Sequence, residues 1–202
     1  MSEIKRKQSN NRERIIGVAA GGICLSLAEI LSLITVFKMP QGGSITPASM
    51  LPIILYGLCF GPKWSFPVAF LYGVLQMIND PSMIVSFPQA LMDYIFAFTV
   101  LGVSGFFAAS GEIRIGKKQI LGRLAFIPFW KIFVATLSAI AGRLVFSVLA
   151  GIIFYGAYVP EGQHALVYSL GYNASYLVPE LLITVFVLFA MRGFLQLRKK
   201  SV

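Results

Sequence analysis

The stretch IIGVAAGGICLSLAEILSLITVF, residues 15–37, contains a single charged side chain, Glu29. A helix needs roughly 20 mainly apolar residues to cross the hydrocarbon core of a bilayer. The stretch is therefore predicted to be a transmembrane helix, preceded by a basic N-terminal tail over residues 1–14. This prediction decides the fold class, because a chain with one transmembrane helix is anchored in the lipid bilayer, and its other apolar segments can then lie in lipid as well.

The composition of the whole chain agrees with that prediction. Hydrophobic residues make up 57% of the 202 residues and charged residues 12%, whereas a soluble domain carries about 25% charged residues. We predict an all-α integral membrane protein, a single transmembrane domain over residues 1–202. Its six transmembrane helices are expected at 15–37, 47–60, 64–78, 87–109, 128–156 and 166–195. Two of these, 47–60 and 64–78, are short, so they are expected to be covered by protein or to line a cavity.

The basic residues are distributed unevenly along this topology. If the N-terminus is cytoplasmic, the predicted outer loops hold Lys38 alone, whereas Lys131 and Arg143 fall within a helix and the other basic residues lie on the inner side. The positive-inside rule then places both termini in the cytoplasm. The net charge of +9 is accordingly interpreted as contact with membrane lipid, and no nucleic-acid partner is predicted.

The sequence lacks the common catalytic motifs. It contains no GxxxxGK[ST] phosphate loop, no HExxH and no GxSxG. The single histidine, His164, has no ligand set around it in sequence, and Cys24 and Cys59 lie in apolar segments. We predict that the chain is not an enzyme and holds no metal or cofactor. Energy for uphill transport would have to come from an ion gradient or from another protein.

Ionisable residues within apolar segments are functional candidates, because they are costly in a bilayer. Gln89 and Asp93 are four residues apart and share a helix face. Asp93 either presents its carboxylate to a ligand or pairs with Lys131 or Arg143. Glu180 is expected to serve Arg143 or freed backbone donors, and Glu29 has no assigned partner.

Tyrosines gather near the expected outer end of the last two helices. They are either an interfacial belt or a cage that stacks on a flat or cationic ligand. A carboxylate, an amide and aromatic rings together would suit a flat, cationic, nitrogen-rich ligand. The side chains concerned are Tyr155, Tyr158, Tyr168, Tyr172, Tyr176 and Asn173.

Small residues recur in the first helix, as Gly17 with Gly21 and as Gly22 with Ser26. Such pairs let helices approach closely in lipid. They serve either internal packing or the docking of a partner protein.

Several of these residues fall within ordered motifs that span the chain. Together the motifs resemble the thiamine-specific S-components of energy-coupling factor (ECF) transporters. They are Met39-Pro40-Gln41-Gly42-Gly43-Ser44-Ile45-Thr46, Met50-Leu51-Pro52, Tyr72-Gly73, Leu91-Met92-Asp93-Tyr94, Tyr158-Val159-Pro160-Glu161-Gly162, Tyr168-Ser169, Tyr172-Asn173-Ala174-Ser175-Tyr176 and Pro179-Glu180.

The resemblance implies a six-helix S-component fold in a bacterial plasma membrane. It implies that thiamine is captured at the outer face without chemical change. It also implies three partner subunits, a transmembrane coupling protein and two ATPases, which would explain the missing phosphate loop. The pair Gly22 and Ser26 would then contribute to the docking face, and the loop with Gly42, Gly43 and Ser44 would act as a lid.

The resemblance also implies a set of thiamine-binding residues. Two positions differ from the pattern, since Ser147 stands where some members have histidine and Tyr155 where they have a stacking tryptophan. Both replacements are expected to weaken ring contacts. The full implied set is Asp93, Tyr94, Ser147, Gly151, Tyr155, Tyr168 and Asn173.

One geometric condition and two alternatives remain open. Tyr168 and Asn173 are about 140° apart on an ideal helix, so both face one ligand only if Tyr168 lies before the regular helix or in its first turn, and Gly171 could provide a local break. The ligand could instead be a thiamine precursor or analogue. The chain could also be a stand-alone ion-coupled secondary transporter that uses Asp93, Arg143 and Glu180 as a relay.

Overall fold

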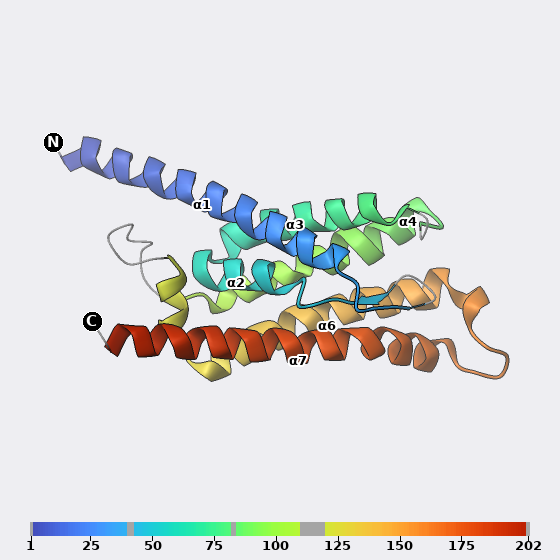
Figure 1. The fold of residues 1–202 in the computed structure, drawn as a ribbon. Helices are drawn as coiled ribbons and strands as arrows, with labels where there is room; N and C mark the ends of the chain where they lie inside the picture. Colours follow the sequence, from blue (N-terminus) through green and yellow to red (C-terminus); the bar gives the residue numbers. More distant parts are fainter. Residues whose placement is uncertain (1, 40–42, 82–83, 110–119, 201–202) are drawn as a thin grey trace.

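The computed structural model describes residues 2–39, 43–81, 84–109 and 120–200 as an almost entirely helical bundle (Figure 1). The only strands in this described part form one short hairpin. The longer elements are α1 (Ser2–Leu33), α2 (Leu51–Phe60), α3 (Pro62–Asn79), α6 (Phe129–Phe154) and α7 (Ala165–Lys200). Between α3 and α6, the segment from Phe87 to Phe107 is helical throughout.

Each of the six predicted segments contains helix, but the first one ends early. α1 stops at Leu33 rather than at position 37, so that part of the prediction was wrong. Phe37–Lys38 (β1) instead pairs antiparallel with Ser44–Ile45 (β2). The helix ends early because the chain after it folds back into the hairpin, where the amide of Val36 donates to the Ile45 carbonyl at 2.9 Å. At its other end α1 begins at Ser2, so residues 2–14 of the predicted tail belong to the helix.

Four described helices are long and apolar enough to cross a membrane: Asn11–Leu33, Phe87–Phe107, Phe129–Phe154 and Ala165–Arg198. α2 is shorter, and at 1.5 Å per residue its ten residues reach only about half of a ~30 Å hydrocarbon core. All of its residues from Pro52 to Phe60 are buried. α2 is therefore covered by protein on every side, as a helix that stops inside a membrane must be.

Glycines bring α1 close to α2 and α3. Gly17 and Gly21 of α1 face inward, where an added Cβ would lie 3.2 Å from the Trp64 ring and 3.0 Å from Val68, respectively. Tyr56 of α2 donates its hydroxyl to the Gly17 carbonyl at 2.9 Å. This pair of small residues therefore serves internal packing.

The helical segment from Phe87 to Phe107 changes its winding three times. Phe87–Ala90 (α4) is followed by a π-helix, Leu91–Phe96 (η2), then by Ala97–Thr99 (α5) and a 3₁₀ helix, Val100–Phe107 (η3). Single π turns inside helices occur frequently at functional sites. Here the π turn contains Asp93 and Tyr94.

The two termini lie at the same end of the molecule (Figure 1). The hairpin, α4 and the connection between α6 and α7 lie toward the opposite end (Figure 1). That connection includes the 3₁₀ turn Gly156–Tyr158 (η5), whereas Ile120–Phe126 (η4) precedes α6.

Candidate functional site

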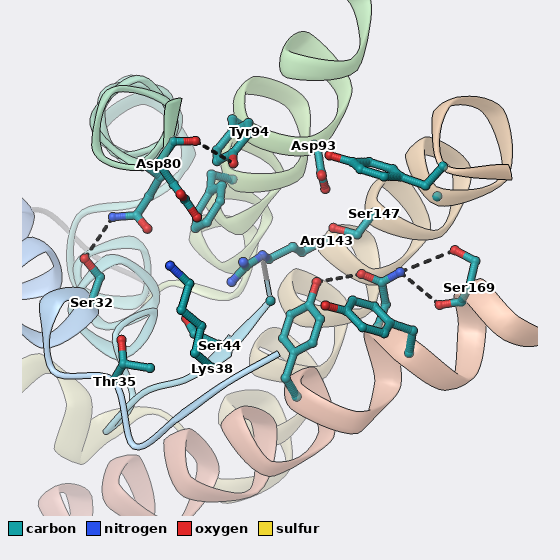
Figure 2. A pocket seen from close by; sticks show the side chains of 18 of the residues that line it. Ser32, Thr35, Lys38, Ser44, Asp80, Asp93, Tyr94, Arg143, Ser147 and Ser169 are labelled. Carbon is teal, nitrogen blue, oxygen red and sulfur yellow. Dashed lines mark hydrogen bonds between the residues drawn. The ribbon is translucent and has the colours of Figure 1, made fainter. Parts of the chain in front are cut away.

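A cavity of about 270 Å³ opens near the end of the bundle away from the termini. This is close to the lower end of the ~300–1,000 Å³ range of small-molecule pockets. Its wall is built by the ends of α1 and α3, the β1–β2 hairpin, the π turn, the second half of α6 and the first half of α7 (Figure 2). All seven predicted binding residues line it: Asp93, Tyr94, Ser147, Gly151, Tyr155, Tyr168 and Asn173.

Asp93 projects into this cavity among neutral polar groups. The Gln89 amide donates to Asp93 Oδ2 at 3.2 Å and to the Tyr155 hydroxyl at 2.9 Å. Gln89 is fully buried, so it holds Asp93 and Tyr155 in fixed relation. Ser147 lies beside the carboxylate (Figure 2). The shared face predicted for Gln89 and Asp93 is confirmed.

The two cations considered as partners of Asp93 have other neighbours. Arg143 lines the cavity, but its guanidinium lies 4.0 Å from the centre of the Phe98 ring and donates to the Met50 sulfur at 3.1 Å. Lys131 Nζ lies 5.6 Å from the Trp130 ring centre. The Asp93 carboxylate faces the cavity, which Arg143 also lines.

The clustered tyrosines form one side of the cavity. Tyr168 and Tyr172 stack with ring centres 6.4 Å apart, and the Tyr155 and Tyr158 rings lie 5.9 Å apart. All of them and Tyr176 line the cavity. Of the two sequence interpretations, the arrangement favours a ligand cage, although Tyr158 is 54% exposed.

Asn173 is held from both sides of its amide. Its nitrogen donates to the Ser169 carbonyl at 2.9 Å, and its oxygen accepts from the Tyr176 hydroxyl at 2.6 Å. α7 begins at Ala165, so Tyr168 lies in the first turn and lines the cavity with Asn173. No break occurs at Gly171, where the helix is continuous.

Gly151 provides close packing beside the cavity. A Cβ at this position would lie 3.1 Å from the Ser169 Cβ and would clash with its hydroxyl. That hydroxyl donates to the Val148 carbonyl at 3.1 Å. The absent side chain therefore lets α6 and α7 approach each other where both supply cavity residues.

The rim formed by α1 and α3 was missed by sequence reasoning. Glu29 of α1 accepts hydrogen bonds from the side chains of Gln76, at 3.1 Å, and Asn79. This interhelical contact accounts for Glu29, which had no assigned partner. The signal was the polar end of α3, where Gln76 and Asn79 line the cavity together with Asp80, directly after the helix, and Ser32.

Glu180 has a structural partner in Thr46, directly after the hairpin. Its carboxylate accepts from the backbone amide of Thr46, at 2.7 Å, and from the Thr46 hydroxyl. The expectation that Glu180 serves a freed backbone donor is thus confirmed. Of the expected lid residues, Gly43 and Ser44 line the cavity, and Gly42 lies outside the described residues.

Gly22 and Ser26 lie on the opposite face of α1 from Gly17 and Gly21. Both are exposed, and an added Cβ at Gly22 would meet no atom within 4 Å. The Ser26 hydroxyl donates to the Gly22 carbonyl within the helix at 2.9 Å. This face is therefore not used for packing within the described part of the chain.

Residues 18–198 match the family described as "thiamine transporter protein" (Thia_YuaJ). A protein of Bacillus subtilis, "Thiamine transporter ThiT", is 34% identical over 90% of this chain and 91% of its own length. A protein of the same name from Lacticaseibacillus paracasei is 26% identical over 61% of each chain. The solved structure of ThiT from Listeria monocytogenes has the same fold, with a TM-score of 0.73 and 22% identity over 90% of this chain and 96% of that one. The chain belongs to the thiamine transporter family and is a multi-pass protein of a bacterial cell membrane.

Proposed function

We propose that this chain is the thiamine-binding S-component of an ECF-type importer, which captures thiamine at the outer face of the membrane. The observation that carries the proposal is the cavity, in which the Asp93 carboxylate faces a wall of tyrosines. Thiamine is cationic and carries two flat, nitrogen-containing aromatic rings, and this combination of groups suits each of those properties.

We assign the lining residues the following roles in this proposal. Asp93 binds the cationic, aminopyrimidine-bearing ligand, and the Tyr155 ring, oriented by Gln89, stacks on it. The remaining polar contacts come from Tyr94, Ser147, Tyr168 and Asn173. Gly151 contributes by letting α6 and α7 lie close together.

The source of energy is proposed to be a separate ATPase module joined through a transmembrane coupling protein. The chain has no phosphate loop of its own. A relay through Asp93, Arg143 and Glu180 receives no support from the geometry, because Glu180 is engaged by Thr46 and Arg143 lies over Phe98. With both termini cytoplasmic, as the basic residues favour, the cavity faces outward.

Isothermal titration of the purified chain with thiamine tests the binding step. We expect saturable binding at one site, with a dissociation constant below about 1 μM, which corresponds to about −8 kcal/mol of binding free energy. Calorimetry is preferred to intrinsic fluorescence because neither tryptophan, Trp64 or Trp130, lines the cavity. Competition by the pyrimidine moiety alone distinguishes thiamine from a precursor, because a precursor site would bind the pyrimidine as tightly as thiamine. An absence of saturable binding at micromolar thiamine would contradict the proposal.

The exposed face of α1 is proposed as the docking surface for the coupling protein. Gly22→Leu is expected to leave thiamine binding by the isolated chain unchanged, since a side chain there meets no atom of the chain. It should reduce thiamine uptake at least tenfold in cells that contain the ATPase module, because bulk prevents close helix approach. Ala141→Leu, at an exposed position of α6, is the matched control. Undiminished uptake by Gly22→Leu would remove this face as the docking site.

A further inference from the structure

The β1–β2 hairpin is a small element that contributes directly to the cavity wall. Lys38, Gly43 and Ser44 of the hairpin line the cavity. Its own backbone bonds include Val36 to Ile45 at 2.9 Å and Met39 to Gly43 at 2.6 Å. A two-stranded hairpin is marginally stable by itself in water. Its position over the cavity must therefore be fixed by contacts with the helices.

One face of α7 supplies two such contacts, four residues apart. Tyr176 packs against Gly43, where an added Cβ would lie 2.5 Å from the tyrosine ring. One turn further along α7, Glu180 accepts both hydrogen-bond donors of Thr46, directly after β2. Tyr176 also lines the cavity, whereas Glu180 does not. Any influence of Glu180 on a ligand is therefore indirect, and its two hydrogen bonds connect it to the hairpin.

The Thr46–Glu180 contact has the features of a strong anchor. Both residues are almost fully buried, at 3% and 2% exposure, and hydrogen bonds to a charged acceptor strengthen in a medium of low dielectric constant. The Thr46 hydroxyl also accepts from the Ser49 amide at 3.3 Å. The second carboxylate oxygen of Glu180 has no partner in the described part of the chain. The carboxylate is thus placed in a costly environment and its hydrogen bonds go to the hairpin.

We propose that Glu180 is a positioning residue that anchors the hairpin through Thr46 and thereby sets how long a ligand is retained in the cavity. The ligand part of this inference rests on the proposed thiamine-binding function. Loss of the anchor frees the covering wall without changing Asp93 or the tyrosines. The dissociation rate constant of thiamine should therefore rise, while the association rate constant changes little.

Three variants of the full chain in detergent test the anchor. Thr46→Val removes the hydroxyl at nearly constant volume, Glu180→Gln removes the charge, and Thr46→Ser keeps the hydroxyl. Chase of bound radiolabelled thiamine should show dissociation about tenfold faster for Thr46→Val and Glu180→Gln, the effect of losing one charge-assisted hydrogen bond. Thr46→Ser should restore a rate near that of the parent chain.

Hydrogen exchange without ligand provides a second readout. In Thr46→Val, the amides of 36–39 and 43–46 should exchange faster, while those of α2 keep their protection. Unchanged dissociation together with unchanged hairpin exchange would overturn the anchor. Equal loss of protection in α2, or no rescue by Thr46→Ser, would also overturn it and indicate general destabilisation. If the parent chain binds no thiamine, the proposed function fails, and the exchange experiment still decides whether Glu180 holds the hairpin.

Discussion

Replacing Asp93 with asparagine is expected to weaken thiamine binding by about 10- to 100-fold without unfolding the chain. The carboxylate faces the cavity beside the neutral side chains of Gln89 and Ser147. Arg143 and Lys38 line the same cavity, but the Arg143 guanidinium lies over the Phe98 ring, so we expect a cationic ligand to pair with Asp93 directly. A hydrogen bond to a charged group contributes about 1.5–3 kcal/mol, and each 1.4 kcal/mol is a tenfold change in affinity. Isothermal titration of the variant and parent chains measures the effect.

The control for this prediction is another acid-to-amide change outside the cavity. Glu161 is exposed and does not line the cavity, so Glu161→Gln should bind thiamine like the parent chain. The helical circular dichroism spectrum of Asp93→Asn should remain that of the parent, because asparagine keeps the size of the side chain and can still accept from Gln89. An unchanged dissociation constant for Asp93→Asn would show that the carboxylate does not bind the ligand.

Gly151→Ala is expected to lower both the unfolding temperature and the affinity for thiamine. The added methyl group would clash with the Ser169 hydroxyl, and packed interiors accept an extra methylene only at a cost of about 1–3 kcal/mol. Separation of α6 from α7 would also move Ser147 and Tyr155 away from Tyr168 and Asn173. Thermal unfolding and titration of the purified chain measure both effects.

Two further variants separate this clash from a general effect of alanine. Gly171→Ala places the same methyl group on α7, where no atom lies within 4 Å, so it should be neutral or slightly stabilising. Ser169→Ala removes the hydroxyl with which the added methyl group of Gly151→Ala would clash. The double variant should therefore recover part of the lost stability and affinity. A Gly151→Ala chain as stable and tight-binding as the parent would show that α6 and α7 need not be so close.

The sequence predicted the composition of the site better than its boundaries. Asp93, Tyr168 and Asn173 were identified because a carboxylate, a ring and an amide stand out within apolar helices, and motif resemblance added Ser147 and Gly151. The rim at Gln76 and Asn79 was missed, because polar residues at a helix end are equally typical of an ordinary loop. Their role depends on Glu29, which lies far away in sequence.

The early end of α1 shows a related limit. Hydropathy continues without interruption through position 37, and no local signal separates the helix from the strand that follows. The structure ends the helix at Leu33 because residues beyond it pair with Ser44–Ile45. Pairing with a later segment overrides local helix preference, since β preference depends strongly on tertiary context.

The sequence by itself determined that this chain lies in a membrane, that it is helical, and which chemical groups are available to a ligand. These properties depend on the transfer of side chains into lipid and on local backbone hydrogen bonds, both of which are additive along the chain. Only the tertiary structure decided which small-residue pair of α1 packs inward, where the polar rim lies, and that Glu180 holds Thr46 across a separation of 134 residues. These features depend on contacts between distant segments, whose geometry no local pattern specifies.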